Sequence, residues 1–186
     1  MRTFLAVPVP VGTAEALYRE RASLRDEWQG VRWVPPLNFH FTLYFFGELQ
    51  AALLPELCAR LTLLLAGRSC FTIELTGLGC FGSPVWPKVI FEAVGTGTEE
   101  LCELHFALRP VIEPLLGWKD EPFRPHLTLG RFRRNGGSQT GILLPEGKSA
   151  KIHEFQADKI ILYHSSTEPG GAVYTPLETW TLKEVK

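Results

Sequence analysis

The tetrapeptide His40-Phe-Thr-Leu43 and its near copy His126-Leu-Thr-Leu129 decide the fold of this chain of 186 residues. The two histidines lie 126 − 40 = 86 residues apart, and each tetrapeptide follows a helical pattern and a proline-bearing segment. The chain contains 5 His, 14 Thr and 27 Leu. Two His-x-Thr-Leu matches would therefore arise in roughly one of a thousand shuffled sequences, so composition does not explain them. The repeat predicts two related halves that meet in a cleft.

The alternation of side chains along a strand predicts where the polar residues of the repeat point. Residues at i and i+2 share one face, so His40 and Thr42 lie opposite Phe41 and Leu43. The second tetrapeptide alternates in the same way. Each polar face then presents an imidazole and a hydroxyl roughly 6–7 Å apart along the strand. Two such faces opposite each other would surround one phosphorus atom with two proton-transfer groups and two hydroxyl donors.

Hydrophobic periodicity places the other elements along the chain. Apolar residues at helical spacing predict helices over residues 11–28, 51–66 and 98–116. Short apolar runs predict strands over residues 2–8, 31–34, 39–46, 71–75, 88–94, 126–132, 150–155, 159–165 and 173–182. Early alternation of strands and helices followed by a run of strands predicts an α+β fold. We expect residues 1–186 to form a single bilobal domain, with two pseudo-symmetric lobes of mostly antiparallel sheet, helices outside and a central cleft.

Turn and cap residues predict where these elements end. Thr13 is expected to cap the first helix, Gly67 to end the second, and Pro110 and Pro114 to kink or divide the third. A loop rich in Gly, Ser and Pro is expected at residues 76–87, an exposed and mobile loop at 133–140, and a turn at 169–171.

Composition limits the classes of function. The formal net charge is -1 and the pI is about 6.5, so any contact with nucleic acid must come from a local basic patch. The four cysteines form no CxxC pair and read as free thiols of a reducing compartment: Cys58, Cys70, Cys80 and Cys102. The N-terminus lacks the features of a signal peptide, and no apolar run is long enough to span a bilayer. We expect a soluble, cytoplasmic protein with no membrane partner.

Histidine suits phosphodiester chemistry because its ordinary pKa of about 6.5 lets one copy be neutral and the other protonated near pH 7. The neutral imidazole would activate water, and the protonated one would donate to the departing oxygen. The threonine hydroxyls would hold the non-bridging oxygens. Two histidines without clustered carboxylates or thiolates are a poor metal-ligand set, and no phosphate-binding glycine loop is present, so no metal or other cofactor is expected.

Beyond the repeat itself, two longer motifs carry a family resemblance: Val31-Arg32-Trp33-Val34-Pro35-Pro36 and Arg124-Pro125-His126-Leu127-Thr128-Leu129-Gly130-Arg131. With the ending over residues 163–174, the chain resembles the 2H phosphoesterase superfamily over nearly its whole length. The most similar branch is the RNA 2′,3′-cyclic phosphodiesterases, historically called 2′-5′ RNA ligases. The resemblance implies a pseudo-two-fold bilobal fold and metal-independent opening of RNA 2′,3′-cyclic phosphate ends to 2′-phosphates. The implied partners are such RNA ends or small cyclic nucleotides, and a monomer is expected.

The same resemblance implies roles for four residues. His40 and His126 match the family's catalytic pair, and Thr42 and Thr128 match its phosphate-orienting pair. Relatives that leave a 2′-phosphate imply His40 as the proton donor to the 3′ oxygen and His126 as the proton acceptor. Phe41 departs from the aliphatic residue that the family often carries there, which we expect to affect packing more than chemistry.

Several flanking residues are candidates for RNA contact. The arginines beside the motifs could neutralise phosphates: Arg32, Arg124 and Arg131, with Arg133 and Arg134 extending the basic segment. Trp33 and Phe46 could stack on a base, although aromatic residues beside strands more often belong to the core. The three remaining histidines lack a threonine partner and are expected to be structural or exposed: His105, His153 and His164.

Three alternatives stay open beside the hydrolase. A 2′-5′ RNA ligase would use the same residues, with an incoming 5′-hydroxyl in place of water, and the sequence cannot separate the two reactions. A non-catalytic RNA- or nucleotide-binding module would keep the cleft without turnover. A metalloenzyme is disfavoured by the ligand set.

Overall fold

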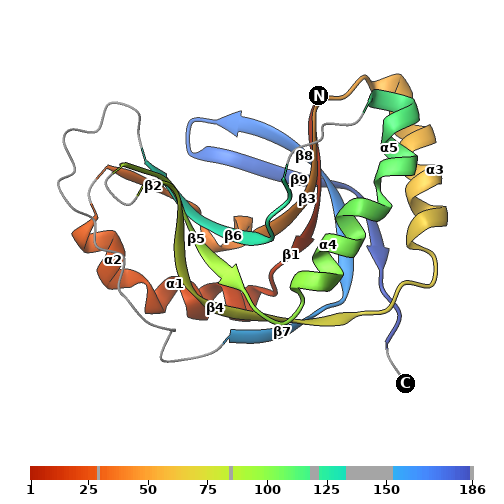
Figure 1. Ribbon diagram of the computed structural model, residues 1–186. Coiled ribbons are helices and arrows are strands. Elements are labelled where there is room, and N and C mark those ends of the chain that lie inside the picture. Colours follow the sequence, from red (N-terminus) through yellow and green to blue (C-terminus); the bar gives the residue numbers. More distant parts are fainter. Residues whose placement is uncertain (29, 84–85, 118–121, 133–152, 185–186) are drawn as a thin grey trace.

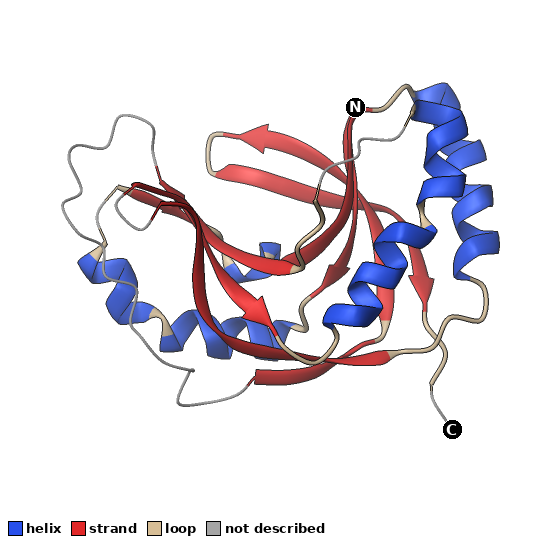
Figure 2. Ribbon diagram, viewed as in Figure 1, coloured by secondary structure: helices blue, strands red, loops and turns tan. Residues whose placement is uncertain are grey.

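Two antiparallel sheets dominate the fold. The computed structural model describes residues 1–28, 30–83, 86–117, 122–132 and 153–184. One sheet has four strands in the order β3-β1-β8-β9: β1 (Arg2–Pro8), β3 (His40–Glu48), β8 (Lys159–Glu168) and β9 (Gly171–Thr181). The other has five in the order β2-β6-β5-β4-β7: β2 (Val31–Trp33), β4 (Phe71–Ser83), β5 (Trp86–Val94), β6 (His126–Phe132) and β7 (His153–Ala157). Figures 1 and 2 show the two curved sheets, which confirm the predicted α+β class.

Helices flank the sheets on two sides. The helices are α1 (Val11–Glu20), α2 (Ala22–Glu27), α3 (Leu54–Leu65), α4 (Thr98–Ala107) and α5 (Arg109–Leu116). Two short 3-10 turns, η1 (Pro36–Asn38) and η2 (Ala51–Leu53), precede β3 and α3. In Figure 1, α1 and α2 run along the five-stranded sheet, whereas α3, α4 and α5 gather at the opposite end of the molecule. The helices therefore lie at the outside of the two sheets, as predicted.

The two lobes are interleaved along the chain, which the sequence repeat did not predict. Strand β2 from the first half pairs with β6 from the second, with Val31 opposite Phe132. The final hairpin β8–β9 returns to β1, with Phe4 opposite Tyr163. A lobe built from one half alone would have left β1 and β3 as a two-stranded ribbon, which is only marginally stable in water. Exchange of strands between the halves completes both sheets.

Two of the predicted helices are each divided into two. The first predicted helix is two helices separated at Arg21, and it begins at Val11 directly after Pro10, with no side-chain cap. The prediction that Thr13 caps it is wrong, because Thr13 already lies in the first helical turn. The division of the predicted 98–116 helix is confirmed, since α4 and α5 separate at Leu108 and Pro110 falls in the first turn of α5, where its missing N–H costs nothing.

Glycine is required at two positions, one at a helix end and one beside an aromatic ring. Gly67 follows α3 with a positive φ of 82° and confirms the predicted helix end. The predicted loop at 76–87 is largely strand, because β4 continues to Ser83 and pairs with β5. A Cβ on Gly79 would lie 2.5 Å from the Phe91 ring, so glycine there leaves space for that ring. The predicted loop at 133–140 and the first part of the 150–155 strand lie outside the described residues.

The apolar faces of the repeated motifs fix their strands in the core. Phe41 and Leu43 are each 1% exposed, and Leu127 and Leu129 are also buried. Burial of each such side chain stabilises the fold by roughly 1.5–3 kcal/mol. Thr42 and Thr128, on the opposite faces, remain partly accessible. The predicted alternation is therefore confirmed in both strands, and it turns the polar faces outward from the core.

Candidate active site

His40 is held at the start of β3 by the backbone turn before it. The prolines at the start of η1 bend the chain so that the Asn38 amide donates to the Pro35 carbonyl at 2.9 Å. The Asn38 carbonyl in turn lies 2.7 Å from His40 Nδ1. A carbonyl oxygen can only accept, so Nδ1 carries the hydrogen. This tautomer leaves Nε2 of His40 as the atom available for proton transfer.

His126 is held in the same way in the other sheet. Its Nδ1 lies 2.7 Å from the Arg124 carbonyl, again two residues earlier, with Pro125 in between. The two halves of the repeat thus share an anchoring device as well as a tetrapeptide. Both imidazoles donate through Nδ1 and leave Nε2 free for chemistry.

Aromatic rings enclose His40. Phe4 lies 4.8 Å from it between ring centroids, and Tyr174 meets it edge-on at 5.3 Å. Tyr163 adds a third ring at 6.5 Å. This burial lowers the pKa of His40 to about 4, helped by the positive charges of His126 and Arg131, although the hydrogen bond to Asn38 acts in the opposite direction.

His126 lies in a similar aromatic environment. Phe81 approaches its ring edge-on at 4.7 Å, and Phe91 lies at 5.5 Å. Burial lowers the pKa of His126, the hydrogen bond to Arg124 opposes that effect, and Arg131 lowers the pKa further. Both imidazoles are therefore mainly neutral at pH 7 in the free protein. A proton donor must gain its proton when an anion binds nearby.

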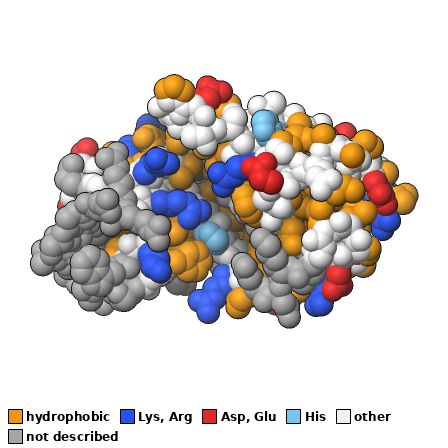
Figure 3. All heavy atoms as spheres, turned by 90° about the horizontal axis from the view of Figure 1, so that it is seen from above, with side chains coloured by type: hydrophobic (Ala, Val, Ile, Leu, Met, Phe, Trp, Pro, Cys, Tyr) orange, Lys and Arg blue, Asp and Glu red, His pale blue; other side chains and the backbone are white. Residues whose placement is uncertain are grey.

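Strands β3 and β6 bring the two motifs together across the two sheets. The charge of His126 acts on His40, and the charge of Arg131 acts on both imidazoles, so the three groups form one electrostatic cluster. Seen from above, the molecule is hollowed near the centre of this face, where an imidazole lies among several Lys and Arg side chains (Figure 3). Basic side chains around a hollow concentrate positive potential there.

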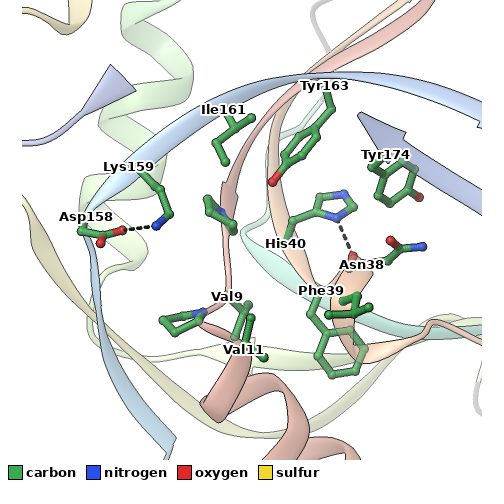
Figure 4. A pocket seen from close by; sticks show the side chains of 13 residues that line it. Val9, Val11, Asn38, Phe39, His40, Asp158, Lys159, Ile161, Tyr163 and Tyr174 are labelled. Atoms are coloured by element: carbon green, nitrogen blue, oxygen red, sulfur yellow. Dashed lines mark hydrogen bonds and ion pairs between the residues drawn. The ribbon is translucent and has the colours of Figure 1, made fainter. Parts of the chain in front are cut away.

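Each histidine also lines a pocket of its own. The pocket beside His40 extends along the end of β1 and the start of β8 (Figure 4). The pocket beside His126 is lined by rings and small side chains from β4, β5 and the start of α4, including Phe81, Phe91 and Ala93, and by Arg124. Space is therefore available on two sides of the histidine pair.

The predicted arginines occupy different places around the site. Arg131 on β6 is paired in register with Arg32 on β2, and both side chains are exposed. Arg124 is exposed next to His126 and serves the site through its carbonyl. Arg133 and Arg134 lie outside the described residues.

Comparison with known proteins shows the family to which this chain belongs. Residues 7–91 match the model of the family described as LigT like Phosphoesterase. An RNA 2′,3′-cyclic phosphodiesterase of Thermus thermophilus is 32% identical over 192 residues, which covers 98% of this chain and 91% of that protein. This chain is a LigT-like phosphoesterase. A protein of the same name from Archaeoglobus fulgidus is 30% identical over 97% of this chain and 99% of its own length.

Solved structures share the fold of this LigT-like phosphoesterase. The crystal structure of TT0787 of Thermus thermophilus superposes with a TM-score of 0.83 at 31% identity and covers 99% of both chains. The LigT protein of E. coli in its apo form gives a TM-score of 0.79 at 25% identity, covering 98% of this chain and 97% of that one. The same E. coli protein has been crystallised with 3′-AMP, at a TM-score of 0.76 and 25% identity over 97% of each chain.

Sequence reasoning missed the rings that enclose the imidazoles. Phe4, Tyr163 and Tyr174 come from strands far apart in sequence, and only the sheet order brings them to His40. Trp33 and Phe46 could have stacked on a base, but Trp33 stacks on Trp28 at 6.3 Å and both pack against the core. Both are partly buried, which agrees with the interpretation of these residues as part of the packing around the core.

Two of the remaining histidines of this LigT-like phosphoesterase are buried and hydrogen-bonded, as expected for structural residues. His105 is buried, with Nδ1 2.7 Å from the Leu43 carbonyl and its ring stacked on Phe123 at 4.1 Å. His153 is buried with Nε2 2.8 Å from Glu20. All four cysteines are free. Across the ranges that the structure describes, no three His, Cys, Asp or Glu side chains could hold a metal ion together, and no helix is long and apolar enough to cross a membrane.

Proposed function

We propose that this protein hydrolyses RNA 2′,3′-cyclic phosphate ends to 2′-phosphomonoesters. The observation that carries the proposal is the matched anchoring of His40 and His126 through Nδ1, together with the electrostatic effect of His126 on His40. Relatives that cover nearly the whole chain carry the name RNA 2′,3′-cyclic phosphodiesterase. We further propose that residues 1–186 act as one domain and as a cytoplasmic monomer, in keeping with four free thiols.

The reaction needs one proton acceptor and one proton donor. Water attacks phosphorus as its proton passes to Nε2 of a neutral imidazole, and the bond from phosphorus to the 3′ oxygen breaks. The second imidazole, protonated at Nε2, donates that proton to the leaving 3′ oxygen, so the products are a 2′-phosphate and a 3′-hydroxyl. The hydroxyls of Thr42 and Thr128 and the charge of Arg131 hold the non-bridging oxygens as negative charge builds on them.

The division of roles follows from the arrival of the substrate. His40 is the donor and His126 the acceptor in this proposal. In the free protein the pKa of His40, about 4, keeps it neutral at pH 7. The phosphodiester anion is an opposite charge at close range and raises the pKa of the imidazole beside it. Substrate binding therefore favours protonation of His40, which later transfers this proton to the 3′ oxygen.

Single alanine substitutions at the two histidines test the proposal. RNA ending in a 2′,3′-cyclic phosphate is incubated with protein and chelator, and the product is read by 31P NMR. We expect His40→Ala and His126→Ala each to lower kcat by roughly 10²–10⁴-fold with little change in product affinity. His164→Ala, a histidine of β8 that takes no part in the reaction, serves as the matched control. Turnover retained by both variants would refute the proposal. If the wild-type protein shows no turnover and the two variants lose affinity for the product, a binding module is favoured instead.

The pocket beside His126 supports ligation as a second activity. Water needs no pocket, whereas the ribose of an incoming 5′-hydroxyl nucleotide does, and this space adjoins the imidazole that would take its proton. Adding RNA with a free 5′-hydroxyl to the same reaction should then give a 2′-5′ joined product. Hydrolysis alone at millimolar acceptor would remove ligation from the proposal.

A further inference from the structure

Asn38 connects three parts of the molecule just before β3 begins. Its backbone amide donates to the Pro35 carbonyl at 2.9 Å, and its own carbonyl accepts from His40 Nδ1 at 2.7 Å. Its side-chain Nδ2 donates to the Ala172 carbonyl at 2.8 Å, which links segments 134 residues apart. The proposed reaction uses only the carbonyl of Asn38, so the side chain has no role in that reaction.

Ala172 belongs to the end of the β8–β9 hairpin, which extends beyond the rest of its sheet (Figure 1). Strand β1 pairs with β8 only as far as His164, whereas β8 and β9 pair with each other up to Glu168 and Gly171. Among the described residues, this hairpin end, residues 165–174, therefore has no third strand beside it. A two-stranded ribbon is only marginally stable in water, so a contact with another part of the protein helps to hold it in place.

The hairpin end carries one of the rings that enclose His40. Tyr174 meets the imidazole edge-on, with ring centroids 5.3 Å apart (Figure 4). Within the ranges that the structure describes, the bond from Asn38 to Ala172 is the one hydrogen bond that joins the hairpin end to a segment outside β8 and β9. The side chain of Asn38 thus fixes the strand that carries Tyr174, while its carbonyl fixes the imidazole that this ring covers.

The second half of the repeat encloses its histidine differently. Arg124 occupies the position equivalent to Asn38, and its carbonyl accepts from His126 Nδ1 in the same way, but its side chain is exposed. The rings around His126 come from β4 and β5, which both lie between other strands of the five-stranded sheet. The enclosure of His40, by contrast, depends in part on the hairpin end.

We propose that Asn38 is a positioning residue that holds the hairpin end closed over His40. The inference rests on the proposed function, in which His40 is the proton donor, and adds a residue that acts through this imidazole rather than on the substrate. While the bond from Asn38 to Ala172 is made, Tyr174 keeps water from one side of the imidazole. When the bond is absent, the hairpin end opens more often and water reaches the ring.

Opening of the hairpin end changes the hydration of His40 and leaves the charges around it in place. The charges that act on this imidazole are those of His126 and Arg131, which both lie on β6 of the other sheet. Tyr163 and Tyr174 also face it, but burial raises the pKa of both phenols above the ordinary 10, so they stay neutral. Burial is the largest cause of the low pKa of His40, so opening should raise that pKa from about 4 towards the ordinary 6.5.

NMR titration of the imidazole Cε1 protons in the free protein measures this effect without turnover. Asn38→Ala and Asn38→Leu both remove the amide donor and keep the backbone carbonyl that anchors His40, and Asn38→Leu also keeps the size of the side chain. We expect both variants to raise the pKa of His40 and to leave that of His126 near its wild-type value. Gln156→Ala is the matched control, because it removes an exposed amide that donates to Thr72 at 2.7 Å in the other sheet, and it should change neither pKa.

Amide hydrogen exchange and the pH profile report the opening and its consequence. Loss of one hydrogen bond should raise exchange across residues 165–174 roughly two- to tenfold in both Asn38 variants. With 2′,3′-cyclic AMP as substrate, the acidic side of the kcat/KM profile should move to higher pH in these variants, because it follows the lower pKa of the pair.

The outcomes separate this inference from the proposed function. A wild-type pKa of His40 in both Asn38 variants would overturn the inference, and so would an equal rise of that pKa in Gln156→Ala. Unchanged exchange across residues 165–174 would also overturn it. Absence of hydrolysis by the wild-type protein would refute the proposed function instead, since the NMR and exchange measurements need no substrate.

Discussion

The pH dependence of kcat/KM is the sharpest test of the electrostatics at this site. The proposed reaction needs one imidazole neutral and the other protonated, and kcat/KM reports the pKa values of the free protein. Burial lowers both pKa values, that of His40 to about 4 and that of His126 to below its ordinary 6.5. The singly protonated pair is most populated between those two values. The optimum of kcat/KM should therefore lie between about pH 4 and 6.5.

The size of the effect follows from the same pKa values. A pKa of about 4 leaves roughly one His40 in a thousand protonated at pH 7, which makes the imidazolium about 3 kcal/mol less favourable than at an exposed histidine. Above the higher of the two pKa values the rate falls tenfold per pH unit. At pH 8, kcat/KM should be at least about 30-fold below its maximum, because the higher pKa is below 6.5. The optimum of kcat lies at higher pH, since bound phosphate raises both pKa values.

Hydrolysis of 2′,3′-cyclic AMP at low substrate concentration, measured from pH 3.5 to 9 at constant ionic strength, gives the profile. Circular dichroism at each pH excludes loss of fold, and NMR of the imidazole Cε1 protons gives the two pKa values directly. A maximum of kcat/KM at or above pH 7.5 would contradict the assignment of two depressed imidazoles. A flat profile between pH 5 and 9 would contradict acid–base catalysis by the pair.

Three other substitutions report on the surroundings of the site. Arg131→Gln removes a positive charge that lowers the pKa of both imidazoles, so the fall of kcat/KM on the alkaline side of its pH profile should move to higher pH. An unchanged position of this fall would show that the charge is screened. Gly79→Ala places a methyl group 2.5 Å from the Phe91 ring, so urea denaturation should show a loss of roughly 1–3 kcal/mol in unfolding free energy. Gly170→Ala should show no loss, because no neighbour lies within 4 Å of the added methyl group. Burial raises the pKa of Glu92 above 4.5, so this group stabilises the fold below pH 4.5, and the contribution is lost as pH rises through the folded pKa. Glu92→Gln should remove this pH dependence from the unfolding free energy. The same slope of unfolding free energy against pH in the variant and the wild type would contradict this prediction.

Local patterns in the sequence determined much of this protein. Alternation over two residues predicted that Phe41 and Leu127 are buried and that Thr42 and Thr128 are accessible, because the strand period depends only on the local backbone. Pro110 predicted the division of a helix for the same reason, because its missing N–H affects only the local hydrogen bonding of the helix. The repeat and its flanking motifs indicated the family, which the comparisons confirm.

The tertiary structure decided what depends on residues far apart in the chain. The interleaving of the lobes and the extension of β4 to Ser83 both require a partner strand that local patterns do not name. The two imidazoles show this most clearly, because a histidine in a sequence has a pKa near 6.5 wherever it stands. Phe4 and Tyr163, more than 30 and 120 residues from His40, remove water from its ring and lower that pKa to about 4. Desolvation depends on every neighbour in space, so only the folded chain sets the proton affinity of the site.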